Sequence, residues 1–303
     1  MRTIYLGTSD FAAGILAHLA AGPHRPALVI TRPDRPRGRG RRLQAPPVAD
    51  RARALGLELF QPDNLHEPDP LERIAALRPE ILCVCAYAVL IREPLLSSYE
   101  VLNVHPSLLP RWRGAAPIER AIMAGDPRTG VSIMRLEAGL DSGPVSLQET
   151  EVIRAEDDFE SLSARLESLG GELLVRALDE RPPSAEQPAE GVTYAEKIEA
   201  ADRTLDPERS PEALECVVRG LRPHIGARVR LPRDAGFLGV VDARPVLEAE
   251  PDHEEGRLRV VPGPPPRLLL ECRGGALELT RVQPPGGRAM PGADWLRGRP
   301  APY

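Results

Sequence analysis

The order of apolar and polar residues predicts alternating strands and helices in the amino-terminal part of the chain. Short, almost continuous apolar runs indicate buried strands at residues 2–7, 27–31, 57–60, 81–86, 101–105, 129–136 and 145–152. Between them, apolar residues at helical spacing predict helices at residues 10–19, 48–55, 71–77, 116–124 and 159–179. This alternation is typical of an α/β protein with a Rossmann-like, doubly wound sheet.

The remainder of the chain has a different pattern. A predicted helix at 210–221 precedes short strands, broken by proline and glycine, at 227–231, 239–243, 257–261, 268–272 and 276–282. Such strands predict a small, OB-like β-barrel. A proline-rich segment at 181–191 separates the two patterns and has the composition of a linker. We therefore expect an amino-terminal domain at 1–188, a linker at 189–205 and a carboxyl-terminal domain at 206–303.

Composition limits where the protein can work. Of the 303 residues, 42% are hydrophobic, which is enough for large cores, but no apolar run approaches the ~20 residues of a membrane span. The amino terminus lacks the long apolar stretch of a secretory signal, so we expect a cytoplasmic protein without membrane association. Four cysteines at this spacing are weak evidence for zinc, and we expect reduced, structural thiols at Cys83, Cys85, Cys216 and Cys272.

Charge is distributed unevenly along the chain. The net charge of −5 excludes a global basic field that would draw nucleic acid to the whole surface. Locally, however, six arginines crowd residues 32–42, with only Asp34 to oppose them. Proline and glycine in this segment predict an exposed loop without regular structure. The segment is either a solvated linker or a loop whose guanidinium groups grip a polyanion.

Two polar residues stand out in the predicted strand at 101–105. Asn103 and His105 are two positions apart, so both side chains leave the strand on the same face. Pro106 lacks an N–H group and disfavours helix for the residue before it, so the strand should end at His105. An amide and an imidazole thus lie together at the carboxyl end of a strand, where open α/β sheets bind ligands.

The surroundings of this pair decide between a structural histidine and a functional one. Residues 106–110 form a stiff, largely apolar hairpin, which suits the wall of a pocket for a flat aromatic ligand. Downstream, Asp141 lies in a predicted tight turn flanked by glycines, which let the backbone approach a ligand closely. We therefore expect Asn103, His105 and Asp141 to converge on one site.

Three motifs carry a resemblance to a known family. They are Asn-x-His-Pro-Ser-Leu-Leu-Pro at 103–110, Arg-Trp-Arg-Gly-Ala-Ala-Pro at 111–117 and Gly-Leu-Asp-Ser-Gly-Pro at 139–144. Together they resemble the 10-formyltetrahydrofolate-dependent formyltransferase family, and the likeness extends over nearly the whole chain. The segments at 32–42 and 193–198 resemble those members that act on methionyl-tRNA. Residues 221–227 and the acidic run at 248–255 depart from the family pattern.

The resemblance implies an enzyme that transfers a formyl group from 10-formyltetrahydrofolate to the α-amine of initiator methionyl-tRNA, giving N-formylmethionyl-tRNA for translation initiation. Asn103 would donate to the developing oxyanion. Asp141 would fix the tautomer of His105 or take the amine proton, and the choice between these two residues stays open. No metal is expected, because the folate nitrogen already activates the formyl group. The folate contacts implied by the resemblance are Ser107, Leu108, Leu109 and Pro110, with the backbone of Val89 and Leu90.

Contacts with tRNA are also implied by the resemblance. They fall on the arginine-rich segment and on the sole lysine of the chain, at Arg37, Arg39, Arg41, Arg42 and Lys197. We expect no obligate protein partner. Three other readings stay open: formylation of a nucleotide-sugar amine, hydrolysis of the formyl donor, and RNA binding without turnover.

Overall fold

The computed structural model describes residues 1–37, 42–231, 236–247 and 254–297. Its contacts divide the chain into two compact units, which we describe separately. Unit 1 comprises residues 1–114, 129–152 and 163–194, and unit 2 comprises residues 115–128, 153–162 and 195–303. The units are thus interleaved along the sequence, and the expected division at 1–188, 189–205 and 206–303 stays a prediction.

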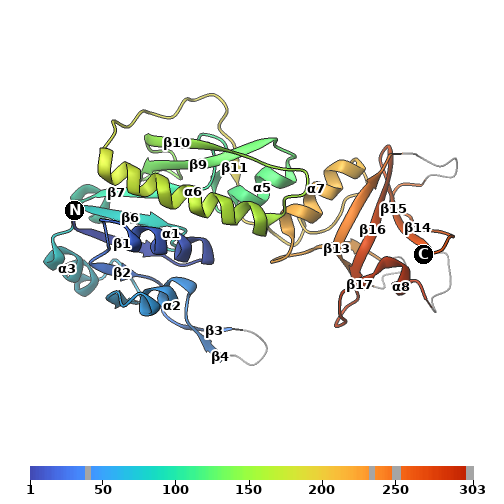
Figure 1. The fold of residues 1–303 in the computed structure, drawn as a ribbon, viewed down its shortest axis with the longest axis horizontal. Helices are drawn as coiled ribbons and strands as arrows, with labels where there is room; N and C mark the ends of the chain where they lie inside the picture. Colours follow the sequence, from blue (N-terminus) through green and yellow to red (C-terminus); the bar gives the residue numbers. More distant parts are fainter. Residues whose placement is uncertain (38–41, 232–235, 248–253, 298–303) are drawn as a thin grey trace. The chain divides into compact units, whose positions relative to one another are not determined.

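Unit 1 is built on a seven-stranded sheet in the order β10-β9-β7-β6-β1-β2-β5 (Figure 1). The central neighbours β2, β1, β6 and β7 are parallel, whereas β9 runs antiparallel to β7. The strands are β1 (Thr3–Gly7), β2 (Leu28–Ile30), β5 (Leu59–Phe60), β6 (Ile81–Cys85), β7 (Glu100–His105), β9 (Arg128–Arg135) and β10 (Val145–Val152). Every strand predicted for this part of the chain is therefore present.

Helices cover both faces of this sheet, which confirms the doubly wound architecture. On one face, the Tyr5 hydroxyl donates to the Ala12 carbonyl of α1 over 2.6 Å. On the other, Ile4 and Leu6 share a buried core with Ile74 of α3. Alternate residues of a strand point to opposite faces, so β1 contacts both helix layers. The helices are α1 (Asp10–Ala21), α2 (Pro47–Ala54), α3 (Pro68–Leu77), α4 (Leu95–Ser98) and α6 (Phe159–Glu180).

Helices α1 and α6 lie side by side, and glycine allows their close approach (Figure 1). A Cβ at Gly14 of α1 would lie 1.8 Å from the Glu167 carboxylate carbon. A Cβ at Gly171 of α6 would lie 2.4 Å from the His18 ring. A larger residue at either position would force the Glu167 or His18 side chain to move.

Cys83 and Cys85 lie fully buried on β6, and the four cysteines are free thiols, as predicted. Burial raises the pKa of the Cys83 thiol to about 12, and burial likewise raises the pKa of Cys85. Such thiols are poor nucleophiles, so these residues serve packing.

The arginine-rich segment is more regular than the sequence suggests. Strands β3 (Arg35–Arg37) and β4 (Arg42–Gln44) form an antiparallel ribbon in which Pro36 is paired with Leu43. The prediction of a loop without regular structure was therefore wrong for these residues. Proline is compatible with an edge strand because its missing N–H can face solvent.

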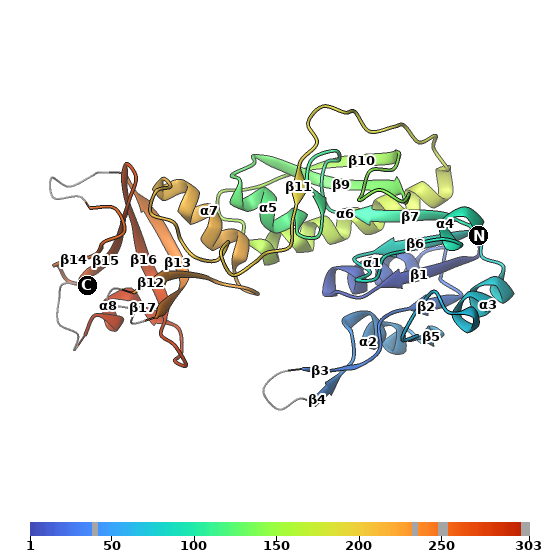
Figure 2. The same cartoon turned by 180° about the vertical axis from the view of Figure 1, so that it is seen from behind.

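Unit 2 contains the predicted carboxyl-terminal antiparallel β domain (Figure 2). Its strands pair in the order β12-β13-β16-β15-β14, with β17 paired to β16. The core joins Met123 of α5 to Leu214 of α7 and to Leu277 of the sheet. The elements are α5 (Pro117–Met123), α7 (Pro211–Leu221), β12 (Ala227–Arg230), β13 (Phe237–Val246), β14 (Leu258–Val261), β15 (Arg267–Cys272), β16 (Gly275–Gln283), β17 (Met290–Pro291) and α8 (Gly292–Trp295).

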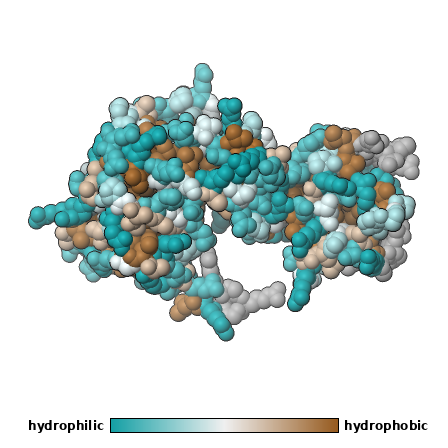
Figure 3. Space-filling view, viewed as in Figure 1, coloured by the Kyte–Doolittle hydropathy of each residue, from teal (hydrophilic) through white to brown (hydrophobic). Residues whose placement is uncertain are grey.

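Among the described residues, no helix is both long and apolar enough to span a bilayer. In Figure 3 the visible face is mostly hydrophilic, and its hydrophobic residues form small, separate patches. Small patches of this kind are normal on protein surfaces.

Candidate active site

Strand β7 brings Asn103 and His105 to its carboxyl end, as the sequence predicts. Both side chains are buried, with relative exposures of 8% for Asn103 and 4% for His105. Their backbones pair with Met134 and Ser132 of β9, which fixes the strand end against a neighbour. No hydrogen bond is found for the Asn103 amide within the described part of the chain. This buried amide is therefore an available donor on a strand whose backbone is held by β9.

The backbone of Trp112 orients the imidazole of His105. Nε2 of His105 lies 2.8 Å from the Trp112 carbonyl oxygen. A carbonyl only accepts, so Nε2 carries the proton and Nδ1 is the nitrogen that can gain or lose one. Oδ2 of Asp141 is 3.7 Å from Nδ1, beyond hydrogen-bond distance, so in this structure the hydrogen bond of His105 is made with the Trp112 carbonyl and not with Asp141. Trp112 adopts a left-handed conformation, with φ 63°.

Asp141 lies beside His105, although the loop that carries it begins elsewhere. Because β9 is antiparallel to β7, Arg135 at the end of β9 pairs with Leu102, some distance from the carboxyl end of β7. The following loop nevertheless places Oδ2 of Asp141 3.7 Å from Nδ1 of His105. Oδ2 also accepts a 2.8 Å hydrogen bond from the Gly114 N–H. Asp141 has a left-handed backbone with φ 44°, which is costly for a residue other than glycine and is typical of functional turns.

The turn at 107–111 is held by a network of short polar contacts. The fully buried Ser107 donates its hydroxyl to the Arg111 carbonyl over 2.6 Å. The Ser132 hydroxyl donates to the Ser107 carbonyl over 2.7 Å and accepts from the Leu109 N–H at 3.2 Å. Gln148 donates to the Leu109 carbonyl over 3.0 Å. The apolar wall predicted from sequence is therefore rigid, and its Ser107 hydroxyl is used within the turn.

Val89 and Leu90 follow the end of β6 and offer backbone groups. The Val89 N–H donates to the Tyr87 carbonyl over 2.7 Å, and the Leu90 carbonyl lies 2.9 Å from Nε2 of His66. Among the described residues, no partner is found for the Val89 carbonyl or the Leu90 N–H. These two groups form an adjacent acceptor and donor, and the Leu90 side chain is 63% exposed.

Comparison with known proteins shows the family of the chain. The sequence model of the family described as Formyl transferase matches residues 1–178, and that of its C-terminal domain matches residues 197–300. The chain belongs to the formyl transferase family. Methionyl-tRNA formyltransferase of Dechloromonas aromatica is 41% identical, over 99% of this chain and 96% of the relative. The proteins of the same name from Halorhodospira halophila and Gluconobacter oxydans are 41% and 40% identical, over 98% and 100% of this chain.

Solved structures of other proteins share the fold. HypX from Aquifex aeolicus, solved in complex with tetrahydrofolic acid, has a TM-score of 0.62 at 18% identity, over 98% of this chain and 47% of HypX. WlaRD, a sugar 3N-formyltransferase, has a TM-score of 0.64 at 12% identity, over 92% of this chain and 96% of WlaRD. At these identities the likeness concerns architecture alone.

The predicted tRNA-contacting residues are placed only in part. Arg37 and Arg42 are opposite each other in the β3–β4 ribbon, and Arg42 is exposed. Arg39 and Arg41 lie outside the described residues, as does most of the acidic run at 248–255. Lys197 is exposed and belongs to unit 2.

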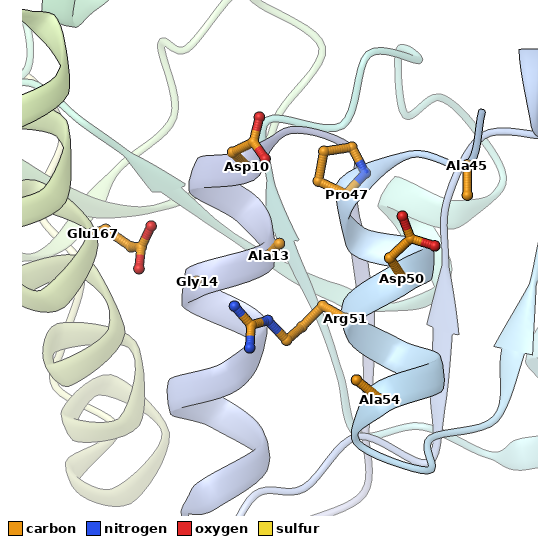
Figure 4. Close-up of a pocket in the computed structure, with 9 residues that line it drawn as sticks. All are labelled: Asp10, Ala13, Gly14, Ala45, Pro47, Asp50, Arg51, Ala54 and Glu167. Atoms are coloured by element: carbon orange, nitrogen blue, oxygen red, sulfur yellow. The ribbon is translucent and has the colours of Figure 1, made fainter. Parts of the chain in front are cut away.

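A cavity of about 600 Å³ lies between α1, α2 and α6, away from the residues above (Figure 4). Three carboxylates line it, and Arg51 extends across it towards Gly14 in the close-up. Burial raises the pKa of the lining residue Glu167. Asn103, His105 and Asp141 are absent from the lining of this cavity, which is formed by Asp10, Ala13, Gly14, Ala45, Pro47, Asp50, Arg51, Ala54 and Glu167.

Sequence reasoning missed several groups that organise the site. Two are backbone groups, the Trp112 carbonyl and the Gly114 N–H. Every residue has such groups except that proline lacks the N–H, so the residue type gives no sign of their role. Two others are glutamines, Gln148 and Gln187, of which the second lies in the segment interpreted as a linker. The sequence offers one hint for Gln187. It is a single amide residue in a proline-rich segment that follows the helix predicted at 159–179.

Proposed function

We propose that this chain transfers the formyl group of 10-formyltetrahydrofolate to the α-amine of initiator methionyl-tRNA. The observation that carries the proposal is the identity of about 40% to methionyl-tRNA formyltransferases over essentially the full length of both chains. The cluster of Asn103, His105 and Asp141 at the end of β7 supplies groups suited to this chemistry. The alternative acceptor, a nucleotide-sugar amine, has only a fold-level likeness in its favour.

The α-amine needs little activation to act as the nucleophile. An ordinary α-amine has a pKa of about 7.7–8.0, so part of it is neutral near pH 7. The folate, when bound, supplies a formyl group that its nitrogen already activates. The protein's task is to align the amine with this group, stabilise the oxygen that becomes negative and remove one proton.

Asn103 is assigned to the developing oxyanion. Its amide is buried, and within the described residues it has no hydrogen bond to give up. A rigid donor of this kind costs no reorganisation when charge develops, and removing one such donor typically slows a reaction by about 10²–10³.

His105 and Asp141 are assigned to proton movement. Nε2 of His105 is engaged by the Trp112 carbonyl, so any proton exchanged by this residue passes through Nδ1. Asp141 uses Oδ2 towards the Gly114 N–H and Nδ1, which leaves Oδ1 for the incoming amine. We therefore assign proton movement to His105 and Asp141 together.

The folate is assigned to the wall at 107–110 and to the backbone at 89–90. The Val89 carbonyl and the Leu90 N–H match the alternating donor and acceptor edge of a pterin ring. The network of Ser132 and Gln148 keeps Leu108, Leu109 and Pro110 in place as the apolar side of this pocket, while Ser107 contributes through the turn it forms.

The tRNA is assigned to the β3–β4 ribbon and its connecting residues, through Arg37, Arg39, Arg41 and Arg42, with a further contact at Lys197. Guanidinium groups on an exposed ribbon suit recognition of a phosphate backbone. The proposed reaction needs only these two substrates, no metal and no protein partner, and takes place in the cytoplasm, where aminoacyl-tRNA is used. Residues 1–188 are proposed as the catalytic domain and 206–303 as the tRNA-binding domain.

The test is transfer of labelled formyl by the purified full chain. Each reaction contains the formyl donor and one acceptor: initiator methionyl-tRNA, elongator methionyl-tRNA or a nucleotide-linked amino sugar. Label on initiator methionyl-tRNA, with much less on the elongator, supports the proposal. Label on the sugar alone, or formate release that is independent of acceptor, contradicts it.

A further inference from the structure

The segment that follows α6 crosses the candidate active site. We call residues 185–193 the strap. Ala185 exchanges two backbone hydrogen bonds with Val145, of 2.8 and 2.9 Å. At the other end, the Thr193 carbonyl accepts from the Arg113 N–H over 2.9 Å, and the Thr193 hydroxyl accepts from the Trp112 N–H over 2.9 Å. The linker interpretation of residues 181–191 was therefore wrong for this part, because its backbone is tied to unit 1.

Gln187 is the central side chain of the strap. Its Nε2 donates to the Asp141 carbonyl and to the Gly143 carbonyl, each over 2.8 Å. Its Oε1 accepts from Nε and Nη2 of Arg113, over 3.0 and 2.7 Å. The side-chain amide thus makes all four hydrogen bonds open to it. These partners also fix which end is oxygen and which is nitrogen. In the flipped amide the NH₂ group would face the Arg113 donors, and the oxygen would face the two carbonyls.

These contacts act on the turn that carries Asp141. Gln187 donates hydrogen bonds to the backbone carbonyls on both sides of Ser142. The Gly114 N–H, next to Arg113 in the chain, donates to the Asp141 carboxylate. The turn needs such support because Asp141 has a left-handed backbone, which persists only where its surroundings over-determine it. Without the amide, the two carbonyls would lose their donors and the turn could relax to a commoner conformation.

We propose that Gln187, itself oriented by Arg113, is a positioning residue that holds the Asp141 carboxylate in reach of His105. The proposal rests on the proposed function for its kinetic consequence. Gln187 makes no contact with either nitrogen of His105; it acts through the Asp141 turn. A misplacement of about 1 Å at a reacting group can cost roughly 10² in rate, so the effect should appear in turnover.

Gln187→Glu is the sharpest variant. The carboxylate keeps an acceptor for Arg113 but has no N–H for the Asp141 and Gly143 carbonyls. The matched control is Glu186→Gln, the reverse exchange at the exposed neighbouring position. We expect kcat for formyl transfer to fall roughly 10²-fold in Gln187→Glu, with the KM for the folate within threefold. The control should match wild type.

A double-mutant cycle separates positioning from a general structural effect. If Gln187 acts through Asp141, then Gln187→Glu costs nothing further in an Asp141→Asn background. A full, multiplicative loss in that background would overturn the proposal.

Amide hydrogen exchange gives a readout that needs no substrate. Gln187→Glu should accelerate exchange at residues 139–144, while exchange in α1 and α6 stays as in wild type. Faster exchange with unchanged turnover would overturn the positioning role, and so would lost turnover with unchanged exchange. If the wild type formylates no methionyl-tRNA, the proposed function fails, and exchange at 139–144 still decides whether Gln187 holds the turn.

Discussion

The Gly114 N–H donates a 2.8 Å hydrogen bond to Oδ2 of Asp141. The same oxygen is 3.7 Å from Nδ1 of His105, and the Trp112 carbonyl, two residues before Gly114, engages Nε2 of that imidazole. The short segment 112–114, which includes strand β8 (Arg113–Gly114), therefore orients both His105 and Asp141 through backbone atoms. Side-chain substitution in this segment can leave these contacts in place, whereas a change of its backbone conformation cannot.

Asn103→Ala should remove most formyl transfer while the fold remains. The methyl group cannot donate to a developing oxyanion, and loss of such a donor typically costs about 10²–10³ in kcat. Steady-state kinetics with methionyl-tRNA measure the loss, and circular dichroism verifies folding. Asn64→Ala, which truncates an exposed amide, is the control and should leave kcat unchanged. Turnover of Asn103→Ala within threefold of wild type would refute the oxyanion role.

Replacing Arg39, Arg41 and Arg42 by alanine should weaken tRNA binding and flatten its dependence on salt. Each lost phosphate contact lowers the slope of log K against log salt by about 0.7–0.9, because fewer counterions are released. The KM for tRNA, measured from low to moderate salt, gives this slope. Arg176→Ala, an exposed arginine whose guanidinium is 3.8 Å from Glu149, should leave the slope as it is. An unchanged slope in the triple variant would make the segment a passive connection.

Gly143→Ala should distort the Asp141 turn, whereas Gly139→Ala should be tolerated. A Cβ at Gly143 would lie 2.0 Å from the Arg135 carbonyl oxygen, which is backbone and cannot step aside. At Gly139 the nearest atom, at 2.2 Å, is the Ser142 hydroxyl, which can rotate away. We expect Gly143→Ala to lose roughly 1–3 kcal/mol of unfolding free energy and most of its turnover. Equal behaviour of the two variants in denaturant titration and kinetics would contradict this account.

Asp202 should contribute stability that disappears in acid. Hydrogen bonds from the Arg120 guanidinium, of 2.8 and 3.0 Å, hold the pKa of the Asp202 carboxyl below its usual range. A lowered pKa gives stability above the unfolded value of about 3.9 and loses it as pH falls through the folded value. Asp202→Asn should therefore melt below wild type at pH 7, with the gap closing below about pH 4. A gap that stays constant down to pH 3 in thermal unfolding would be inconsistent with the ion pair as its source.

The fold followed from the sequence wherever one physical signal dominated. Continuous apolar runs such as 81–85 marked the buried parallel strands, and helical spacing from Phe159 marked α6. The paired strands Arg35–Arg37 and Arg42–Gln44 were not predicted, because proline and glycine disfavour strands locally. Pairing between two short edge strands nevertheless permits them. The interleaving of the two units also escaped, because contacts between distant segments leave no periodicity in the sequence.

The site followed from sequence to a similar extent. Asn103 and His105 were predictable because strand geometry alone puts them on one face. Their association with Asp141 was expected from the glycines that flank it and was strengthened by the resemblance, although nothing local in residues 136–144 reveals that the loop returns towards β7. The tautomer of His105 and the role of Gln187 depend on backbone carbonyls. Because every residue has the same carbonyl group, the sequence could not reveal either feature.

The interleaved units have a consequence for synthesis of the chain. Met123 of α5 shares its core with Leu214 and Leu277, which lie far downstream. At about 5–20 residues per second, α5 leaves the ribosome on the order of ten seconds before these partners exist. Throughout that interval its apolar face is open to chaperones and proteases, and a chain terminated before Leu214 would present it permanently.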